Sequence, residues 1–141
     1  MDDKLVAQLA AEAEIRNLVA RMAHLADSGD LDEYITLFTD DAVRKMPGGT
    51  AKEGRDDILA GAHERRRTGM QGPGTHTRHV NTTLWVRLEG PDDAVAGSYY
   101  LFLENTSTAP AIRRTGRYED RFRRTADGWK MAHRNIVQDV N

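Results

Sequence analysis

Hydrophobic positions near the N-terminus follow the period of a helix. Apolar side chains recur there at three- and four-residue steps, at Ile15, Leu18, Val19, Met22 and Leu25. This spacing places them on one face of an amphipathic helix, which we expect to begin near Lys4. The sequence Ser28-Gly29 predicts its end, because glycine readily adopts a left-handed conformation after a helix.

A shorter helix is predicted directly after this turn. Asp30 is suited to cap its N-terminus, because a carboxylate accepts hydrogen bonds from free backbone N–H groups. The apolar face of this helix comprises Leu31, Tyr34, Ile35 and Phe38. We expect the helix to end at Thr39-Asp40-Asp41 and a short strand to follow over Ala42–Met46.

A third helix is predicted over Gly54–Arg67, after the turn at Pro47-Gly48-Gly49. Its inward side chains are Ile58, Leu59 and Ala62. The run Arg65-Arg66-Arg67 suits the negative pole of the helix. We interpret this run as a solvated helix terminus rather than as a nucleic-acid patch.

The second half of the chain has the pattern of strands. Gly90-Pro91-Asp92-Asp93, the loop 106–110 and the hairpin signal Asp127-Gly128 separate the predicted strands. These strands are Arg78–Glu89, Ala94–Asn105, Ile112–Arg124 and Trp129–Val140. The pattern predicts one α+β domain over residues 1–141, with three N-terminal helices packed on a curved, mixed, mostly antiparallel sheet. Such a sheet would form a cone whose interior is a natural small-molecule site.

Composition narrows the classes of function. The chain has 141 residues and a formal net charge of −2, so charge gives it no general attraction to nucleic acids or membranes. No apolar run is long enough to cross a bilayer, and the N-terminus lacks a hydrophobic signal segment. We therefore expect a cytoplasmic protein. Cysteine is absent, which excludes disulfides, thiolate nucleophiles and Cys-ligated zinc.

The principal candidates for chemistry are Asp27, at the end of the first helix, and His79, at the start of the first long strand. Histidine titrates near neutral pH and suits a general base, and a carboxylate on its other ring nitrogen would fix the tautomer. Two alternatives stay open: Asp27 bonded to local backbone, and His79 as a satisfied core histidine. A metal site with His76 is disfavoured, because residues three apart on a strand point to opposite faces.

Further side chains are assigned to the cavity. We place one face of the strand Ala94–Asn105 there, and Tyr118 and Arg134 on later strands are additional candidates, with a surface role as the alternative for Arg134. The predicted substrate-binding residues are Met22, Tyr99, Leu101, Leu103, Asn105, Tyr118 and Arg134.

Four segments together resemble a known superfamily. They are ADSGDLDEYITLFTDDA, EGRDDI, THTRHVNTTLWV and GRYEDRFRRTADGWKMAHR. The chain resembles the NTF2-like superfamily, and more narrowly its SnoaL-like branch, which includes scytalone dehydratase, bile-acid 7α-dehydratase and the dehydrochlorinase of lindane degradation. The resemblance implies a cone fold, catalytic roles for Asp27 and His79, and a pocket tyrosine at Tyr118. The chain departs from several relatives at Met22, where they carry Tyr or Lys, and at Leu103 and Asn105, where some carry a second acid or histidine.

These observations favour a cofactor-independent lyase or isomerase of the dehydratase type, acting on a small, cyclic, apolar substrate. The alternatives are a non-catalytic binding module and an accessory subunit of a partner enzyme. We expect no cofactor, no metal, and neither nucleic acid nor membrane as a partner. We expect a homo-oligomer, either a dimer or a trimer.

Overall fold

The computed structural model describes residues 2–140, which fold as an α+β structure. Within these residues the helices are α1 (Asp3–Ser28), α2 (Leu31–Ile35) and α3 (Arg55–Arg67). The strands are β1 (Phe38–Lys45), β2 (Ala51–Glu53), β3 (Arg78–Leu88), β4 (Asp93–Glu104), β5 (Ala111–Thr125) and β6 (Gly128–Gln138).

Helix α1 forms for the reasons that its sequence indicates. The side chain of Asp2 caps its N-terminus and accepts a hydrogen bond from the backbone N–H of Lys4 at 2.8 Å. The five apolar residues of the predicted face are all buried. Their burial joins the helix to the core, since each fully buried aliphatic side chain contributes about 1.5–3 kcal/mol.

The end of α1 corrects one expectation. Gly29 has φ −103°, so it does not adopt the predicted left-handed conformation. Glycine is required there for a different reason: a Cβ atom at this position would lie 2.9 Å from Cα of Leu25. The chain therefore leaves α1 by passing close to its last turn.

The second helix is shorter than predicted. Asp30 caps it as expected and accepts a hydrogen bond from the backbone N–H of Asp32 at 2.8 Å. The helix ends at Ile35, and Phe38 begins strand β1 instead of completing the helical face. Phe38 is fully buried. An apolar residue suits the buried face of a helix or of a strand, so its hydrophobicity alone does not distinguish the two.

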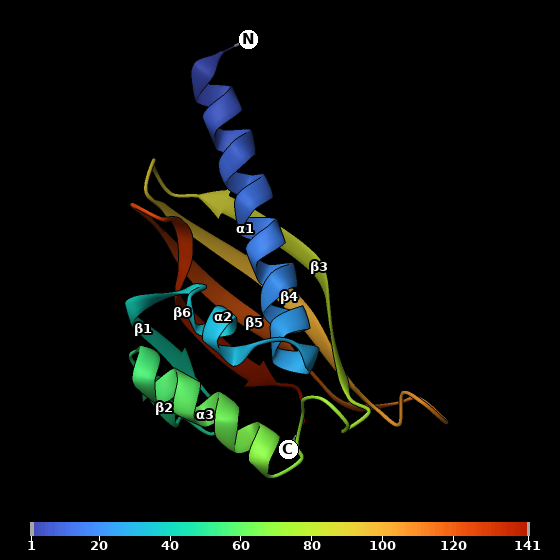
Figure 1. Cartoon of the computed structure of the whole chain (residues 1–141). Coiled ribbons are helices and arrows are strands. Elements are labelled where there is room, and N and C mark those ends of the chain that lie inside the picture. Colours follow the sequence, from blue (N-terminus) through green and yellow to red (C-terminus); the bar gives the residue numbers. More distant parts are fainter. Residues whose placement is uncertain (1, 141) are drawn as a thin grey trace.

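The predicted strand between the second and third helices is present, and it begins earlier than expected, at Phe38. Strands β1 and β2 lie between α2 and α3, and β2 was not expected from the sequence. Helix α3 packs beside β1 and α2 through Ile58 and Ala62. It therefore closes one side of the structure and does not form a bundle with α1 (Figure 1).

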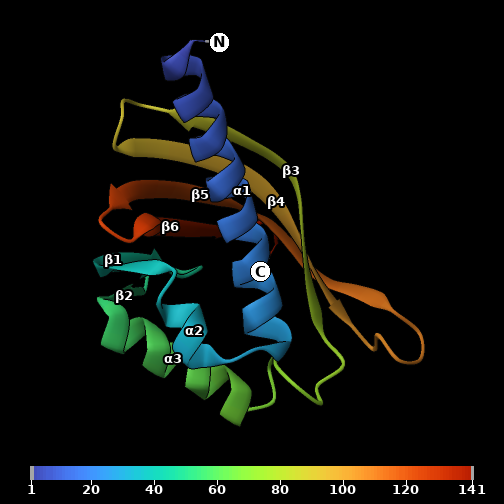
Figure 2. The same cartoon turned by 45° about the horizontal axis from the view of Figure 1, so that its top comes forward.

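The six strands form one mixed sheet in the order β2-β1-β6-β5-β4-β3. Strands β1 and β6 are parallel and the other neighbours are antiparallel. The predicted hairpin at Asp127-Gly128 joins β5 to β6, with Gly128 at φ 105°. The sheet curves around α1, which lies across its concave face (Figures 1 and 2).

Strand β4 faces the opposite way from the prediction. Tyr100 and Phe102 are buried at 6% and 3% exposure, whereas Tyr99 is 55% exposed. The assignment of Tyr99, Leu101 and Leu103 to the cavity was therefore wrong by one residue, which on a strand exchanges the two faces. Asn105 was also misplaced: it is exposed, follows the end of β4 and has φ 55°.

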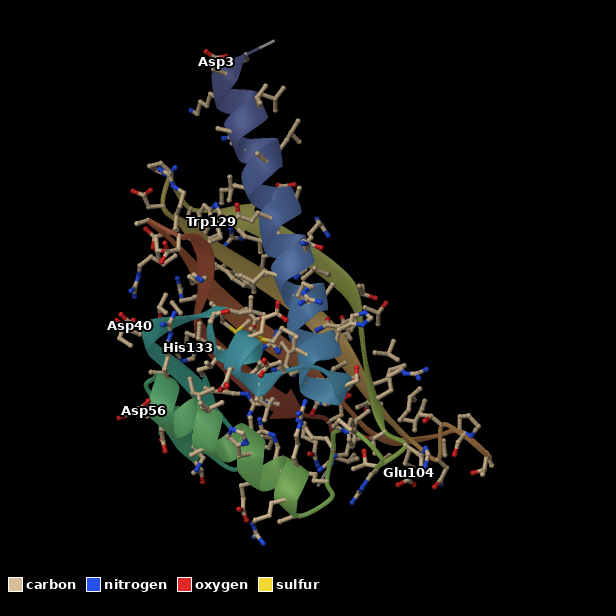
Figure 3. The ribbon with its side chains drawn as sticks, in the orientation of Figure 1. Asp3, Asp40, Asp56, Glu104, Trp129 and His133 are labelled. Atoms are coloured by element: carbon tan, nitrogen blue, oxygen red, sulfur yellow. The ribbon has the colours of Figure 1, made fainter. Side chains whose placement is uncertain are left out.

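The two ends of the sheet differ in their surroundings. Figure 3 shows Trp129 at one end, beside α1, and Glu104 at the opposite end. Trp129 belongs to the main core, while Glu104 is partly exposed and precedes the loop between β4 and β5. The convex face carries exposed Trp85, Tyr99 and Ile112, and the homo-oligomer stays a prediction.

Candidate functional site

Asp27 and His79 lie in direct contact. Nδ1 of His79 is 2.6 Å from Oδ1 of Asp27, and the backbone N–H of His79 donates to Oδ2 at 2.9 Å. Their side chains are only 13% and 17% exposed. One carboxylate thus binds the ring and the backbone of the same histidine, which fixes the imidazole to the end of α1.

This geometry selects a tautomer. An ionised carboxylate can only accept, so Nδ1 of His79 carries the proton and Nε2 is left with its lone pair. The ring also contacts Phe102, the cross-strand partner of His79 on β4, at a centroid distance of 4.7 Å. Phe102 and Asp27 together hold the ring in one orientation.

Two adjoining hollows lie next to His79, inside the curve of the sheet. The larger has a volume of about 90 Å³ and the smaller about 20 Å³. They share five lining residues, namely Arg44, Arg65, Gln71, His79 and Tyr118. These residues come from β1, α3, the loop after α3, β3 and β5, so the cavity exists only in the assembled fold.

The predicted substrate-binding residues divide into two groups. Met22, Tyr118 and Arg134 line the cavity. The side chains assigned to it from β4 and the turn after it do not, because of the one-residue error in phase; these are Tyr99, Leu101, Leu103 and Asn105. The cross-strand register explains the difference, because Phe102 pairs with His79 and Tyr100 pairs with Asn81, and partners in a ladder share a face.

Arg134 is a buried residue and not a surface one. Its Nε and Nη2 donate to the two carboxylate oxygens of Asp120 at 2.8 and 2.9 Å, from the neighbouring strand. Its guanidinium lies over the ring of Tyr118, 3.7 Å from the centroid. Burial alone would lower the pKa of Arg134, but the charge of Asp120 and its hydrogen bonds reverse this and raise the pKa.

Tyr118 is 6% exposed and stacks on Tyr100 with a centroid distance of 4.7 Å. Burial raises the pKa of Tyr118, against the smaller opposite effects of Arg134 and Arg44. The phenol therefore keeps its proton, and it can donate a hydrogen bond to an oxygen atom in the cavity.

Sequence reasoning missed Arg44, Arg65, Tyr100 and Phe102 as lining residues. A signal for Arg65 was present, because Ile58, Ala62 and Arg65 are spaced as one helical face. Arg65 is thus not part of a solvated terminus: of the basic run, only Arg67 is exposed. For Arg44 the signal was its position two residues after buried Ala42 on strand β1, because side chains two apart on a strand lie on the same face.

The metal alternative gains no support from the geometry. His76 is exposed, with φ 54°, and does not line either hollow. Across residues 2–140, no three His, Asp or Glu side chains gather as metal ligands would.

In the same part of the chain, no helix has the length and hydropathy needed to span a bilayer.

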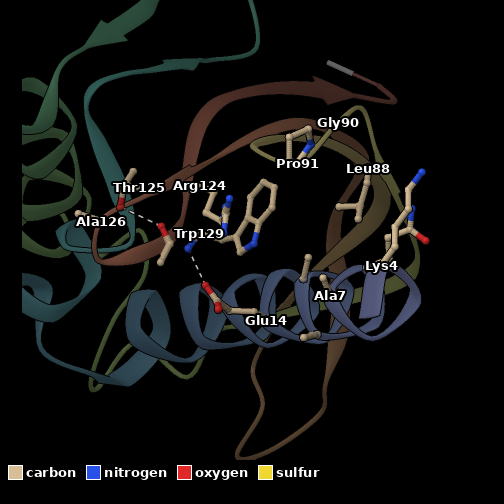
Figure 4. A pocket seen from close by; sticks show the side chains of 14 residues that line it. Lys4, Ala7, Glu14, Leu88, Gly90, Pro91, Arg124, Thr125, Ala126 and Trp129 are labelled. Atoms are coloured by element: carbon tan, nitrogen blue, oxygen red, sulfur yellow. Dashed lines mark hydrogen bonds between the residues drawn. The ribbon is translucent and has the colours of Figure 1, made fainter. Parts of the chain in front are cut away.

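A larger groove, of about 950 Å³, lies elsewhere, between the N-terminal half of α1 and the loops after β3 and β5 (Figure 4). Two of its charged side chains already have partners in the protein. Glu14 accepts a hydrogen bond from the backbone N–H of Trp129, and Arg124 pairs with Asp92. We therefore regard the smaller cavity at His79 as the candidate site, although the groove has the greater volume.

Comparison with known proteins agrees with this fold. An NTF2-like protein with a cystatin-like fold from Novosphingobium aromaticivorans is 28% identical, with 99% of this chain and 92% of that chain aligned and a TM-score of 0.87. A Catenulispora acidiphila protein, solved in complex with S-DNPA, is 27% identical over 93% and 95% of the two chains, with a TM-score of 0.78. A candidate scytalone dehydratase from Novosphingobium aromaticivorans is similar in fold, with 18% identity over 96% and 89% of the chains and a TM-score of 0.78.

No curated protein matches the sequence. The profile of one family, described as a SnoaL-like domain, matches residues 7–135. This match runs from within α1 to within β6 and so includes part or all of every helix and strand that lines the cavity. The chain therefore belongs to the SnoaL-like family, within the NTF2-like fold.

Proposed function

We propose that the protein is a cofactor-independent lyase or isomerase in which His79 removes a proton from a carbon atom of a small substrate. The observation that carries the proposal is the two-point attachment of His79 to Asp27 at the wall of a cavity. A base that is held in one tautomer, with its free nitrogen beside a small hollow, is what proton abstraction requires.

The proposed step can be followed atom by atom. Nε2 of His79 takes a proton from carbon, and the electrons of that C–H bond form a new double bond. In a lyase the bond to a leaving group on the next carbon breaks at the same time, and in an isomerase the charge moves to an oxygen. Asp27 stabilises the imidazolium that forms, as the carboxylate of a Ser-His-Asp triad does.

Tyr118 is the proposed hydrogen-bond donor to the oxygen on which negative charge develops. Its hydroxyl remains protonated because burial raises its pKa. This assignment replaces the missing second acid, which was sought at Leu103 on the wrong face of β4. No electron transfer occurs in the proposed step, so the proposal requires no redox cofactor.

The comparisons support the proposal in a limited way. The relative from Catenulispora acidiphila was solved in complex with S-DNPA. This complex agrees with the proposal that the partner is a small molecule. The name of the candidate scytalone dehydratase fits a dehydration. At 18% identity that relative shows the fold alone, so the reaction stays a proposal.

The test begins with a screen for ligands. Cyclic hydroxy-ketones and related alcohols are tested for thermal stabilisation of the protein, since a ligand that binds the folded state raises its melting temperature. Each hit is then incubated with the protein in D₂O, and NMR detects loss of a carbon-bound proton or release of a dehydrated product. A tight ligand that never exchanges or reacts would instead assign the protein to the alternative of a binding module.

A further inference from the structure

The cavity beside His79 carries a charge that the fold does not neutralise. Arg44 and Arg65 line both hollows, and Arg114 lines the larger one. No Asp or Glu is among the residues that line either hollow. The wall of the cavity is therefore cationic, although the chain as a whole has a net charge of −2.

Two carboxylates close to the cavity are already engaged. Asp120 binds both Nε and Nη2 of Arg134, and Asp27 binds His79. Within residues 2–140, neither Arg44 nor Arg65 forms a salt bridge with any Asp or Glu. These two guanidiniums line both hollows without an acidic partner, and Arg114, which lines only the larger one, forms no salt bridge within these residues either.

Arg65 shares a side-chain hydrogen bond with Tyr34, but part of the hydrogen-bonding capacity of both arginines is unused. In the described part of the chain, the one side-chain hydrogen bond of Arg44 runs from Nη1 to the sulfur of Met46, a weak acceptor. Nε of Arg65 is buried without a partner, and so is Oδ1 of Asn81, which lines the smaller hollow. Buried polar groups in a folded protein nearly always have a partner, and because Arg65 and Asn81 line the hollows, these atoms are available to a ligand there.

The arrangement costs stability in the free protein. Burial and, to a smaller extent, the positive charge of Arg44 lower the pKa of Arg65 to about 10, against the opposite effects of Tyr34 and Tyr118. A desolvated charge without a counter-ion is unfavourable, and a hydrophobic residue in its place is often more stable. Costs of this kind are characteristic of functional sites, where selection acts on binding and not on stability.

We propose that Arg44 and Arg65 bind the carboxylate of a small organic acid, and that this acid is the class of substrate presented to His79. That this acid is a substrate rests on the proposed function, whereas the binding of an acid does not depend on catalysis. Guanidinium groups suit this ligand, because their N–H donors match the two oxygens of a carboxylate.

The dimensions of the cavity limit the rest of the acid. A dry cavity of roughly 150 Å³ accepts benzene, and the larger hollow measures about 90 Å³. Its apolar wall comprises Tyr100, Phe102 and Ile136. The acid therefore has a short apolar body, no larger than a single ring.

The test compares an acid with its uncharged amide. Benzoate and benzamide have nearly the same shape and differ in charge, and acetate and acetamide extend the comparison to a body smaller than a ring. We expect isothermal titration calorimetry to show that at least one acid binds roughly tenfold or more tightly than its amide, the difference that a charge-assisted hydrogen bond gives. If neither acid binds at millimolar concentration, or if the amides bind equally well, the inference is overturned.

Variants locate the effect. The double variant Arg44→Met/Arg65→Met is expected to lose the preference for the acid and to keep its affinity for the amide. The control is Arg67→Met, which removes the same charge from the exposed end of the same helix and is expected to keep the preference. A loss of preference in the control alone would show that the acid binds elsewhere, and would contradict the inference.

Stability separates a binding role from a structural one. Because Arg65 is a partly buried charge without an acidic partner, Arg65→Met is expected to have an unchanged or higher melting temperature without ligand. A large fall would show that Arg65 serves the fold, and would overturn its assignment to a ligand. Arg44→Met is measured in parallel, so that the result does not depend on one variant.

The outcomes for this inference and for the proposed reaction are distinguishable. His79→Ala is expected to keep the preference for benzoate, since the carboxylate is held by arginines, while losing all proton exchange. Selective binding of acids with no exchange by the wild type would leave this inference standing and remove the reaction. Proton exchange on a neutral ligand, without any preference for acids, would support the reaction and overturn this inference.

Discussion

Nη2 of Arg66 donates a hydrogen bond to the carbonyl oxygen of Gly29 at 2.8 Å. The same nitrogen lies 2.8 Å from the carbonyl oxygen of Leu25, which also accepts from the backbone N–H of Gly29, so a residue of α3 adds a donor to the carbonyls at the C-terminus of α1. Asp27 lies between these two positions. Arg66 thus fixes the last turn of α1, and with it the carboxylate that holds His79.

Replacement of Arg66 tests this positioning role. Arg66→Met removes the side-chain donor of the Gly29 carbonyl, while the Leu25 carbonyl keeps the N–H of Gly29, so we expect a loss of stability of about 1–3 kcal/mol, in the range for a carbonyl left unsatisfied. We also expect faster amide hydrogen exchange in the last turn of α1, measured by NMR, and a lower kcat. Arg67→Met, on the same helix but exposed, is the control. Unchanged exchange near Asp27 in Arg66→Met would contradict the role.

The buried pair of Asp120 and Arg134 gives a prediction about stability. Arg134→Met leaves the carboxylate of Asp120 buried and uncompensated, which typically costs about 3–5 kcal/mol. The double variant Asp120→Leu/Arg134→Met removes both charges, and we expect it to recover most of the loss. Denaturant unfolding measures all three proteins. A double variant as unstable as the single one would show that the pair does more than balance charge.

The corrected face of β4 can be tested with two neighbouring tyrosines. Tyr100→Ala removes a ring that lines the cavity and stacks on Tyr118, so we expect weaker ligand binding and lower stability. Tyr99→Ala removes an exposed ring from the convex face, and we expect ligand affinity to stay unchanged. Calorimetry with the same ligand compares them. An equal loss of affinity in both variants would be incompatible with the observed orientation of the strand.

Burial of Tyr118 predicts a dependence of stability on pH. Its pKa is raised in the folded state above the ordinary value of 10.0, so the folded protein holds the phenolic proton more tightly than the unfolded chain. The contribution of Tyr118 to stability is therefore complete below pH 10 and is lost as the pH rises through the raised pKa. The stability of Tyr118→Phe should fall less steeply than that of the wild type as the pH rises above 10, as followed by circular dichroism. Identical alkaline curves would refute this linkage.

Much of the fold could be predicted because its signals are local. The period of Ile15, Leu18 and Val19 indicated α1, and Asp30 indicated the start of α2. The phase of β4 could not be obtained in this way, because both of its faces carry large apolar side chains. Tyr99 and Leu101 compete with Tyr100 and Phe102 for the core, and only the pairing with β3 decides between them.

The candidate site shows the same division. Asp27 and His79 were found by their residue types and by resemblance, although 52 positions separate them in the chain. Arg65 was missed because three consecutive arginines at the end of a helix suggested a solvated terminus. Their exposure differs because each points in a different direction around the helix, and the tertiary contacts of α3 determine which one is buried.

Asp27 and His79 are expected to act as a unit. Asp27→Asn keeps the shape of the carboxylate but removes its charge and can impose the wrong tautomer on His79. We expect kcat to fall by roughly a hundred- to ten-thousandfold, the range for general acid–base catalysis. His79→Ala should cost as much, and the double variant should cost little more than either single one. Additive losses would indicate that the two residues act independently.

The most direct test of the proposed function is incorporation of solvent deuterium into a bound ligand by wild type, His79→Ala and Asp27→Asn. His24→Ala is the matched control, because it removes an exposed imidazole from the same helix as Asp27. The account predicts exchange at one carbon by the wild type and by His24→Ala, and none above background by His79→Ala. Exchange by His79→Ala at the wild-type rate, in a variant that binds the ligand normally, would contradict the central claim that His79 is the base.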